Sequence, residues 1–300
     1  MTTRAIALTL AVALSAASGV GAQETPKQLT GPQAELAAAV DSLTQALIVG
    51  DLEAIKQAIH FPLIAGIVAG TEAVRVEEAT EDLLTQEAVA AAVARYGLAK
   101  QAQLVEPTVE LLAANVAVLA APIQWVSEAG NVLMEDRIAG LFVKHAGGWR
   151  LSAVIMGAVQ ALEPDEATRQ QIDALTNGVV KAVVQQKQDD YMAAFSLPVI
   201  HIEPELGARR LGYNELQAQY RQLTYMVMDV GLADAAVSLR HLFMLGPNAA
   251  CVVGMAKGFD GAGAQIGYRP QAALLVKEAG KWKIIAQAVG TPEEGLAPEQ

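Results

Sequence analysis

The residues that could perform acid–base chemistry lie mainly in the second half of the chain. Tyr225 and Asp229 are four residues apart in a predicted helix, so they share one of its faces. A carboxyl group with a pKa tuned by burial, beside a hydrogen-bonding tyrosine, can move a proton on a small substrate. The other candidate pocket residues are Tyr191, His241, Tyr268 and, in the first half, Trp125. Alternatively, Asp229 is exposed in the last helical turn and Tyr225 packs against the core. We assign no residue a catalytic role.

Residues suited to other chemistries are too few or too scattered. The four histidines, His60, His145, His201 and His241, are far apart in sequence, so we predict no metal and no other cofactor. The glycine-rich residues 258–263 lie between two predicted strands, which predicts a hairpin turn rather than a phosphate-binding loop. The single cysteine, Cys251, lies in an apolar run and is predicted to be buried.

Composition and charge exclude several partners. The chain has a formal charge of −11 and no basic blocks, whereas binding to nucleic acid needs clustered lysine and arginine. Its hydrophobic fraction of 53% is enough for well-packed cores. After the first residues, no run of 18 apolar residues occurs without a charge or break, so we expect no membrane span.

The N-terminal segment has the order of a secretory signal. Arg4 is followed by the apolar residues 5–14 and then by small residues up to Ala22. We therefore predict that residues 1–22 are a signal peptide, that the mature protein begins at Gln23, and that it is periplasmic or secreted. No cysteine lies near the cleavage site, which argues against a lipid anchor.

The rest of the chain is a tandem repeat with a period of about 134 residues. The matching pairs are Phe61-Pro62 and Leu197-Pro198, Gly97 and Gly231, Asn115 and Asn248, Trp149 and Trp282, and Gly157 and Gly290. Their spacing changes by only three residues along the repeat. We predict a first domain at 23–162, a second at 163–292, and an acidic tail at 293–300.

Each copy is predicted to contain helices first and strands afterwards. In copy one the helices are expected at 35–49, 52–59 and from the Thr80 cap to Gly97, and the strands at 102–111, 116–126, 134–144 and 149–156. In copy two the helices are expected at 166–187, 189–195 and from the Asn214 cap to Gly231, and the strands at 235–245, 250–258, 267–277 and 282–289. The X-Pro step should end the second helix. The fold class is therefore α+β, with an antiparallel meander in each copy.

This order of elements, with Trp149 or Trp282 opening the last strand, resembles the nuclear transport factor 2-like superfamily. That group includes ketosteroid isomerases, scytalone dehydratases and polyketide-cyclase-like proteins. The resemblance implies two cone-like domains, in which helices and a curved sheet enclose a pocket. Neither copy has the isomerase pattern, so no catalytic residue is carried over to this chain.

Several predicted strands are apolar at almost every position, among them 116–121, 250–255 and 284–289. A sheet with one solvated face should alternate apolar and polar residues, so both faces of these sheets are expected to be covered. Helices would cover one face, and the sheet of the other copy would cover the second. This predicts an intramolecular pseudo-dimer, paired sheet to sheet.

Three functions remain open at this point. The chain could bind a small hydrophobic ligand without catalysis, or act as an isomerase, dehydratase or cyclase with its site in the second domain. It could also be a protein-interaction module whose cones are filled by their own side chains. The volume and lining of each cone distinguish these functions.

Overall fold

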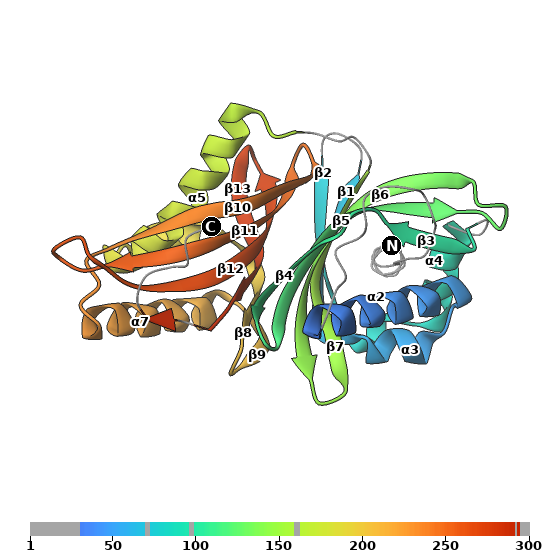
Figure 1. The fold of residues 1–300 in the computed structure, drawn as a ribbon, viewed down its shortest axis with the longest axis horizontal. Helices are drawn as coiled ribbons and strands as arrows, with labels where there is room; N and C mark the ends of the chain where they lie inside the picture. The colour runs from blue at the N-terminus through green and yellow to red at the C-terminus, as the bar shows by residue number, and fades with distance from the viewer. Residues whose placement is uncertain (1–30, 70–72, 96–98, 159–162, 292, 295–300) are drawn as a thin grey trace.

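The computed structural model describes residues 31–69, 73–95, 99–158, 163–291 and 293–294. They form two seven-stranded sheets, each accompanied by helices (Figure 1). The predicted α+β class is confirmed, and the two sheets are consistent with two tandem domains. The predicted signal peptide lies outside the described residues, as do residues 159–162, which precede the predicted domain boundary between 162 and 163.

The first domain contains α2 (Pro32–Val49), α3 (Leu52–Gln57), β1 (Ile59–Ala69), β2 (Ala73–Ala79), the 3-10 helix η1 (Glu81–Leu83), α4 (Gln86–Arg95), β3 (Gln101–Leu104), β4 (Thr108–Ala113), β5 (Val116–Val126), β6 (Val132–His145) and β7 (Gly148–Ala158). The strand order is β2-β1-β7-β6-β5, and both β3 and β4 pair with β5. The expected antiparallel meander is formed by β3 to β7, and β1, which was not expected, runs parallel to β7, so the whole sheet is mixed.

The second domain contains α5 (Glu166–Val184), α6 (Gln188–Ala193), β8 (Phe195–Glu203), β9 (Gly207–Leu211), α7 (Tyr213–Asp229), β10 (Asp234–Gly246), β11 (Ala249–Phe259), β12 (Gln265–Glu278), β13 (Lys281–Val289) and β14 (Glu293–Glu294). The strand order is β10-β11-β12-β13-β8-β9, with β8 parallel to β13. Glu293 and Glu294, predicted to belong to the tail, pair with β12 as β14.

Two predicted helix ends are confirmed by their backbone geometry. Gly50 adopts a left-handed conformation with φ 75° and ends α2, and the Asp51 side chain then accepts a hydrogen bond from the Ala54 amide to start α3. Gly231, with φ 70°, follows α7 in the same way. Glycine suits such positions because it has no Cβ to clash with the preceding carbonyl. Gly97 lies outside the described residues.

Both predicted caps of the third helix are wrong. Thr80 precedes η1 without a side-chain hydrogen bond, and α4 starts only after Thr85, whose hydroxyl accepts from the Ala88 amide at 3.2 Å. In the second domain α7 starts at Tyr213 after Gly212, so Asn214 already lies inside the helix. A capping residue is identified by its backbone conformation as well as its type, and the sequence shows only the type.

The two prolines do not end the second helices. Helix α3 stops at Gln57, and Pro62 lies inside β1; Pro198 lies inside β8 in the same way. The pairing of each strand with its parallel neighbour shifts register around the proline, because proline has no amide hydrogen for the ladder. Likewise, the predicted strand 102–111 is divided into β3 and β4 around Glu106, which has φ 44°.

The buried apolar residues form three clusters. One lies between the helices and sheet of the first domain, and another between the helices and sheet of the second domain. The third, which we call the shared cluster, contains residues of both sheets. Its members are Ile64, Val68, Leu112, Val116, Val118, Ala120, Ala139, Leu141, Val143, Ala153 and Ile155 from the first domain, and Ile200, Ile202, Leu245, Ala249, Cys251, Val253, Ala272, Leu274, Val276, Ile285, Ala286 and Ala288 from the second.

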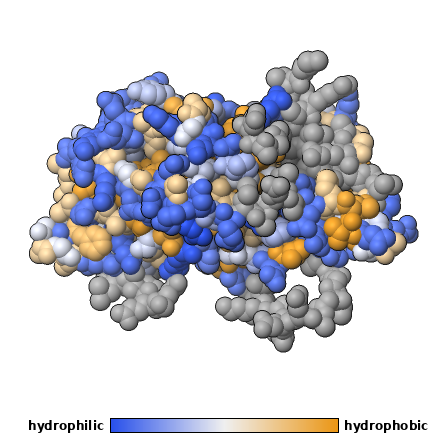
Figure 2. Space-filling model, turned by 90° about the horizontal axis from the view of Figure 1, so that it is seen from above, coloured by the Kyte–Doolittle hydropathy of each residue, from blue (hydrophilic) through white to orange (hydrophobic). Residues whose placement is uncertain are grey.

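Hydrophilic residues cover most of the described surface seen in Figure 2. Half of the large apolar side chains that are exposed among the described residues lie in α7 or directly after it: Tyr213, Tyr225, Met226, Met228 and Val230. No helix in the described part of the chain combines the length and apolar character needed to cross a membrane.

Two glycines mark where the domains approach most closely. A Cβ atom on Gly157 would lie 1.3 Å from the carbonyl oxygen of Leu245, and one on Gly290 would lie 1.9 Å from that of Leu112. The two contacts are equivalent in the repeat, because Gly157 and Gly290 are 133 residues apart and so are Leu112 and Leu245. The backbones of the two domains therefore meet without room for a methyl group.

We predict that Gly157→Ala lowers the free energy of unfolding by at least about 1–3 kcal/mol, because the new methyl group overlaps backbone of the other domain. Chemical denaturation of the purified protein measures this. Gly178→Ala is the matched control: this helical glycine has open space around its Cβ position, and the substitution should stabilise by about 0.5–1 kcal/mol. A Gly157→Ala protein as stable as wild type would contradict the close approach.

Candidate functional site

The inner face of the second sheet is the face that packs against the helices. Val199 and Leu211 lie on this face, in one cluster with the helical residues Ile172 and Leu216. Successive residues of a strand point to opposite faces, so His201 and Glu203 lie on the inner face together with Val199. Ile200 and Ile202 point the other way, into the shared cluster.

Strand pairing brings further polar residues beside His201. It is paired with Arg209 of β9 on one side and with Gln287 of β13 on the other, so all three project from the same face. In β12, Arg269 and Gln271 alternate with the shared-cluster residues and therefore also face inward. We call this group the inner polar cluster: His201, Glu203, Arg209, Arg269, Gln271 and Gln287.

Glu203 connects two basic side chains. One of its carboxylate oxygens lies 3.0 Å from Nε2 of His201, and the other accepts from Arg209 at 3.3 Å. The hydrogen bond from His201 lowers the pKa of Glu203, so the carboxylate is ionised at neutral pH. Burial lowers the pKa of His201 more than Glu203 raises it, so the ring is neutral. Nε2–H then donates to Glu203, and Nδ1 carries the lone pair.

Arg269 is a partly buried cation of the inner polar cluster. Its Nε donates to the carbonyl oxygen of Gly290 at 2.7 Å, and burial lowers its pKa. The charges of Glu203 and Glu205 act in the opposite direction and raise it.

Helices α6 and α7 add more polar atoms to the second domain's interior. Tyr191 is buried with its ring centroid 5.2 Å from that of Tyr220, and burial, followed by the charge of Glu203, raises the pKa of its hydroxyl. The Tyr220 hydroxyl and both polar atoms of the Gln219 amide are buried without a partner among the described residues. Unpaired buried polar atoms are costly unless a water or ligand satisfies them.

A cavity of about 20 Å³ adjoins this cluster. Thr176 and Val179 of α5 form one wall, and Gln271 and Gln287 lie on the opposite wall. A cavity of this size holds about one water molecule. A larger molecule would therefore enter only if α5 or side chains moved.

The first domain has no such cluster at the repeat-equivalent positions. Ala65 corresponds to His201, Val154 to Gln287, and Ile138 to Gln271, and all three belong to the first domain's apolar core. Asp136 corresponds to Arg269 and accepts a hydrogen bond from the Trp125 indole at 3.1 Å. The same fold therefore forms without the inner polar cluster.

The structure places the candidate pocket residues in different parts of the molecule. Tyr191 lies in the second domain's interior, and Trp125 is buried in the first domain. Tyr268 neighbours Arg269 in β12 and points to the opposite face of the strand.

Tyr225 and Asp229 share a face of α7, as the spacing predicts, but that face is exposed to solvent. Asp229 is exposed in the last turn of the helix, as the alternative states, but Tyr225 is 73% exposed and does not pack against the core. The buried positions of α7 are Leu216, Gln219 and Tyr220, which place a different side of the helix inward.

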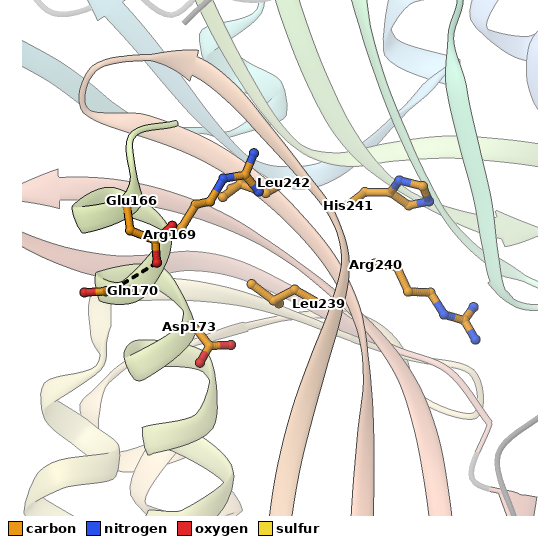
Figure 3. A pocket seen from close by; sticks show the side chains of 8 residues that line it. All are labelled: Glu166, Arg169, Gln170, Asp173, Leu239, Arg240, His241 and Leu242. Atoms are coloured by element: carbon orange, nitrogen blue, oxygen red, sulfur yellow. Dashed lines mark hydrogen bonds between the residues drawn. The ribbon is translucent and has the colours of Figure 1, made fainter. Parts of the chain in front are cut away.

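His241 lies beside an open groove of about 320 Å³ between α5 and β10 (Figure 3). In this view Arg240 and His241 point away from α5, and Glu166 accepts a hydrogen bond from Gln170 on the helix. His241 instead lies 3.1 Å from Glu110 of the first domain. The polar groups of the groove therefore do not converge on one point.

His201, Glu203, Arg209 and Arg269 were not among the predicted pocket residues. A signal for two of them was present in the sequence: 200–203 alternates apolar and polar residues, and the corresponding stretch 64–67 is entirely non-polar. Comparing the copies position by position would have identified the difference. Among the described residues, no group of three or more His, Cys, Asp or Glu side chains could hold a metal ion.

Comparison with known proteins finds similar structures for one domain at a time. No family model matches the sequence, and no curated protein matches it. An NTF2-like protein of unknown function from Shewanella oneidensis MR-1 has 21% identity and a TM-score of 0.34, covering 41% of this chain and 98% of its own. A cystatin-like-fold protein of unknown function from Nostoc punctiforme has 15% identity and a TM-score of 0.35, covering 43% and 94%.

A ketosteroid isomerase-like protein from Erwinia carotovora atroseptica has 18% identity and a TM-score of 0.33, covering 43% of this chain and 96% of its own. The matched length in each case is that of one domain. Two sheets, each with helices, are consistent with two tandem domains.

We predict that stability falls as the pH drops below 6.5. The pKa values of His60, His145 and His201 are all lowered from 6.5, chiefly by burial, so the unfolded chain takes up protons before the folded chain does. Each histidine changes the free energy of unfolding by at most about 1.4 kcal/mol per pH unit. Chemical denaturation at pH 7 and at pH 5.5 measures how steeply the free energy of unfolding depends on pH, and this dependence should be weaker in His201→Ala. An unchanged pH dependence in this variant would show that His201 is not held neutral.

Proposed function

We propose that this chain is an exported, non-enzymatic binding protein whose second domain takes a small molecule on its inner face. The main support for this proposal is that only the second domain has the inner polar cluster. In the first domain, His201, Gln287, Gln271 and Arg269 correspond to Ala65, Val154, Ile138 and Asp136. The ligand would combine an apolar body with a polar group, because the inner face is apolar towards Phe195 and polar towards Glu203.

The duplication supports a binding role for these residues. A buried histidine such as His201 destabilises a core unless it is compensated, and the first domain reaches the same topology with apolar residues. The polar residues are therefore not required by the fold. Their retention in the second domain is explained by a ligand that pairs with them.

The first domain, proposed at 23–162, would act as a scaffold for the second, proposed at 163–292. We propose that the domains pair sheet to sheet as an intramolecular pseudo-dimer. Every first-domain member of the shared cluster except Val68 has its repeat counterpart in that cluster, which supports a two-fold arrangement. Asn115 also donates to the Pro204 carbonyl at 2.7 Å, and Arg137 to that of Met244 at 3.0 Å.

A second candidate function is acid–base catalysis by an isomerase, dehydratase or cyclase. The observation that favours it is the His201–Glu203 pair, in which the carboxylate fixes the neutral ring so that Nδ1 is a potential base. Turnover of a bound ligand that is lost in His201→Gln while binding persists would favour this function over binding alone.

We predict that the double variant His201→Ala/Gln287→Val, which introduces the first-domain residues, stays folded and loses a co-purifying small molecule. Native mass spectrometry of the mature protein from its own host, before and after denaturation, measures the bound mass. Tyr225→Ala/Asp229→Ala on the exposed face of α7 is the control and should keep it. If wild type carries no small molecule, the proposal is wrong and an interaction module is favoured.

Export is part of the proposal. We predict that the mature protein recovered from the periplasm or medium begins at Gln23, because small residues precede the expected cleavage after Ala22. N-terminal sequencing measures this. Protein that is recovered only inside the cell with Met1 intact would contradict it.

A further inference from the structure

The second half of helix α7 is covered on one side only by the described part of the chain. Three residues are buried in the first half of the helix, whereas no residue from 221 to 229 is buried. Leu223 and Val227 pack against the apolar core of the second domain, and the opposite side of the helix faces solvent. This end of α7 lies away from the first domain (Figure 1). An amphipathic helix normally presents polar residues on its solvated side.

The solvated side of α7 is instead apolar around Tyr225. This side chain is exposed, and so are Met226 and Met228, which project on either side of it because an α-helix has 3.6 residues per turn. We call the exposed side chains of Arg221, Tyr225, Met226, Met228 and Asp229 the α7 face. Tyrosine, methionine and arginine are enriched at protein interfaces, and apolar side chains that gather on a surface mark interaction sites. The α7 face therefore has the composition of an interface.

Two opposite charges lie at equal distances from Tyr225 along the helix. Arg221 is four residues before it and Asp229 is four residues after it, so the three side chains form one row. Both charged residues are exposed, and neither forms an ion pair with another described residue. The α7 face is therefore neutral, although the whole chain has a formal charge of −11. Two copies of the chain can meet at this face without bringing like charges together.

We propose that the α7 face binds the same face of a second copy of this chain, with the two α7 helices antiparallel about a two-fold axis at Tyr225. Residues at equal distances on opposite sides of the axis then face each other, so Arg221 of each copy meets the partner's Asp229. The two tyrosine rings lie together at the axis, with the methionines beside them. The order of charges is complementary to itself, which favours a second copy over an unrelated partner.

The contact is small and independent of the other features of the fold. Because only one helix of each copy takes part, the dimer should form at micromolar rather than nanomolar concentration. The members of the α7 face belong to neither the inner polar cluster nor the shared cluster. The dimer and the proposed ligand site can therefore be tested separately, and either can fail without the other.

Sedimentation velocity of the mature chain from about 1 to 100 µM measures the association. Arg221→Asp and Asp229→Arg should each raise the dissociation constant about 10-fold, because two attractive pairs become repulsive. The double variant Arg221→Asp/Asp229→Arg should restore the affinity, since opposite charges face each other again. Lys181→Asp makes the same change of charge at an exposed position of α5 and should leave the association unchanged.

Tyr225→Ala should weaken the dimer about 10- to 100-fold, because both rings at the axis are lost. Circular dichroism should show an unchanged fold, since this side chain is exposed in the single chain. A wild-type protein that stays monomeric at every concentration would overturn the inference, whether another protein or another segment of the chain covers the α7 face. A dimer insensitive to Tyr225→Ala, or a charge-exchanged double variant no tighter than the single variants, would overturn it as well.

Discussion

The burial of apolar side chains from both sheets in one shared cluster is the constraint on which the rest of the structure depends. It explains why strands such as β5 and β11 are apolar at nearly every position, since neither face meets water. It also requires glycine at 157 and 290, where backbone of the other domain leaves no space for a methyl group. Cys251 lies in this cluster, where burial raises the pKa of its thiol to about 12 and leaves it unreactive.

The shared cluster occupies nearly the same repeat positions in the two copies, while the inner faces differ. The first domain fills its inner face with apolar residues and retains a single buried acid, Asp136, bonded to Trp125. The second domain carries the inner polar cluster on the same strands. A duplicated domain thus separates the residues that maintain the fold from residues that can serve a ligand.

Glu203 is the centre of the inner polar cluster, since it bonds to both His201 and Arg209. Glu203 is held ionised by His201 and Arg209, and His201 is held neutral by burial. Because His201 is neutral only when it is buried, the stability of the second domain should fall in acid. The bonds to Glu203 also fix the orientation of the His201 and Arg209 side chains. The small cavity beside Gln271 and Gln287 implies that any ligand larger than water must displace side chains or α5.

The sequence by itself determined the repeat, the α+β class, most strand positions and the turn glycines such as Gly50 and Gly231, because these depend on local conformational preference and on hydrophobic pattern. It also indicated that both sheet faces are buried. Only the tertiary structure decided which polar residues meet. His201 and Gln287 are 86 residues apart and become neighbours through the register of a parallel strand pair. Tyr225 and Asp229 are close in sequence yet face solvent, because the packing of α7 decides which side of the helix points inward.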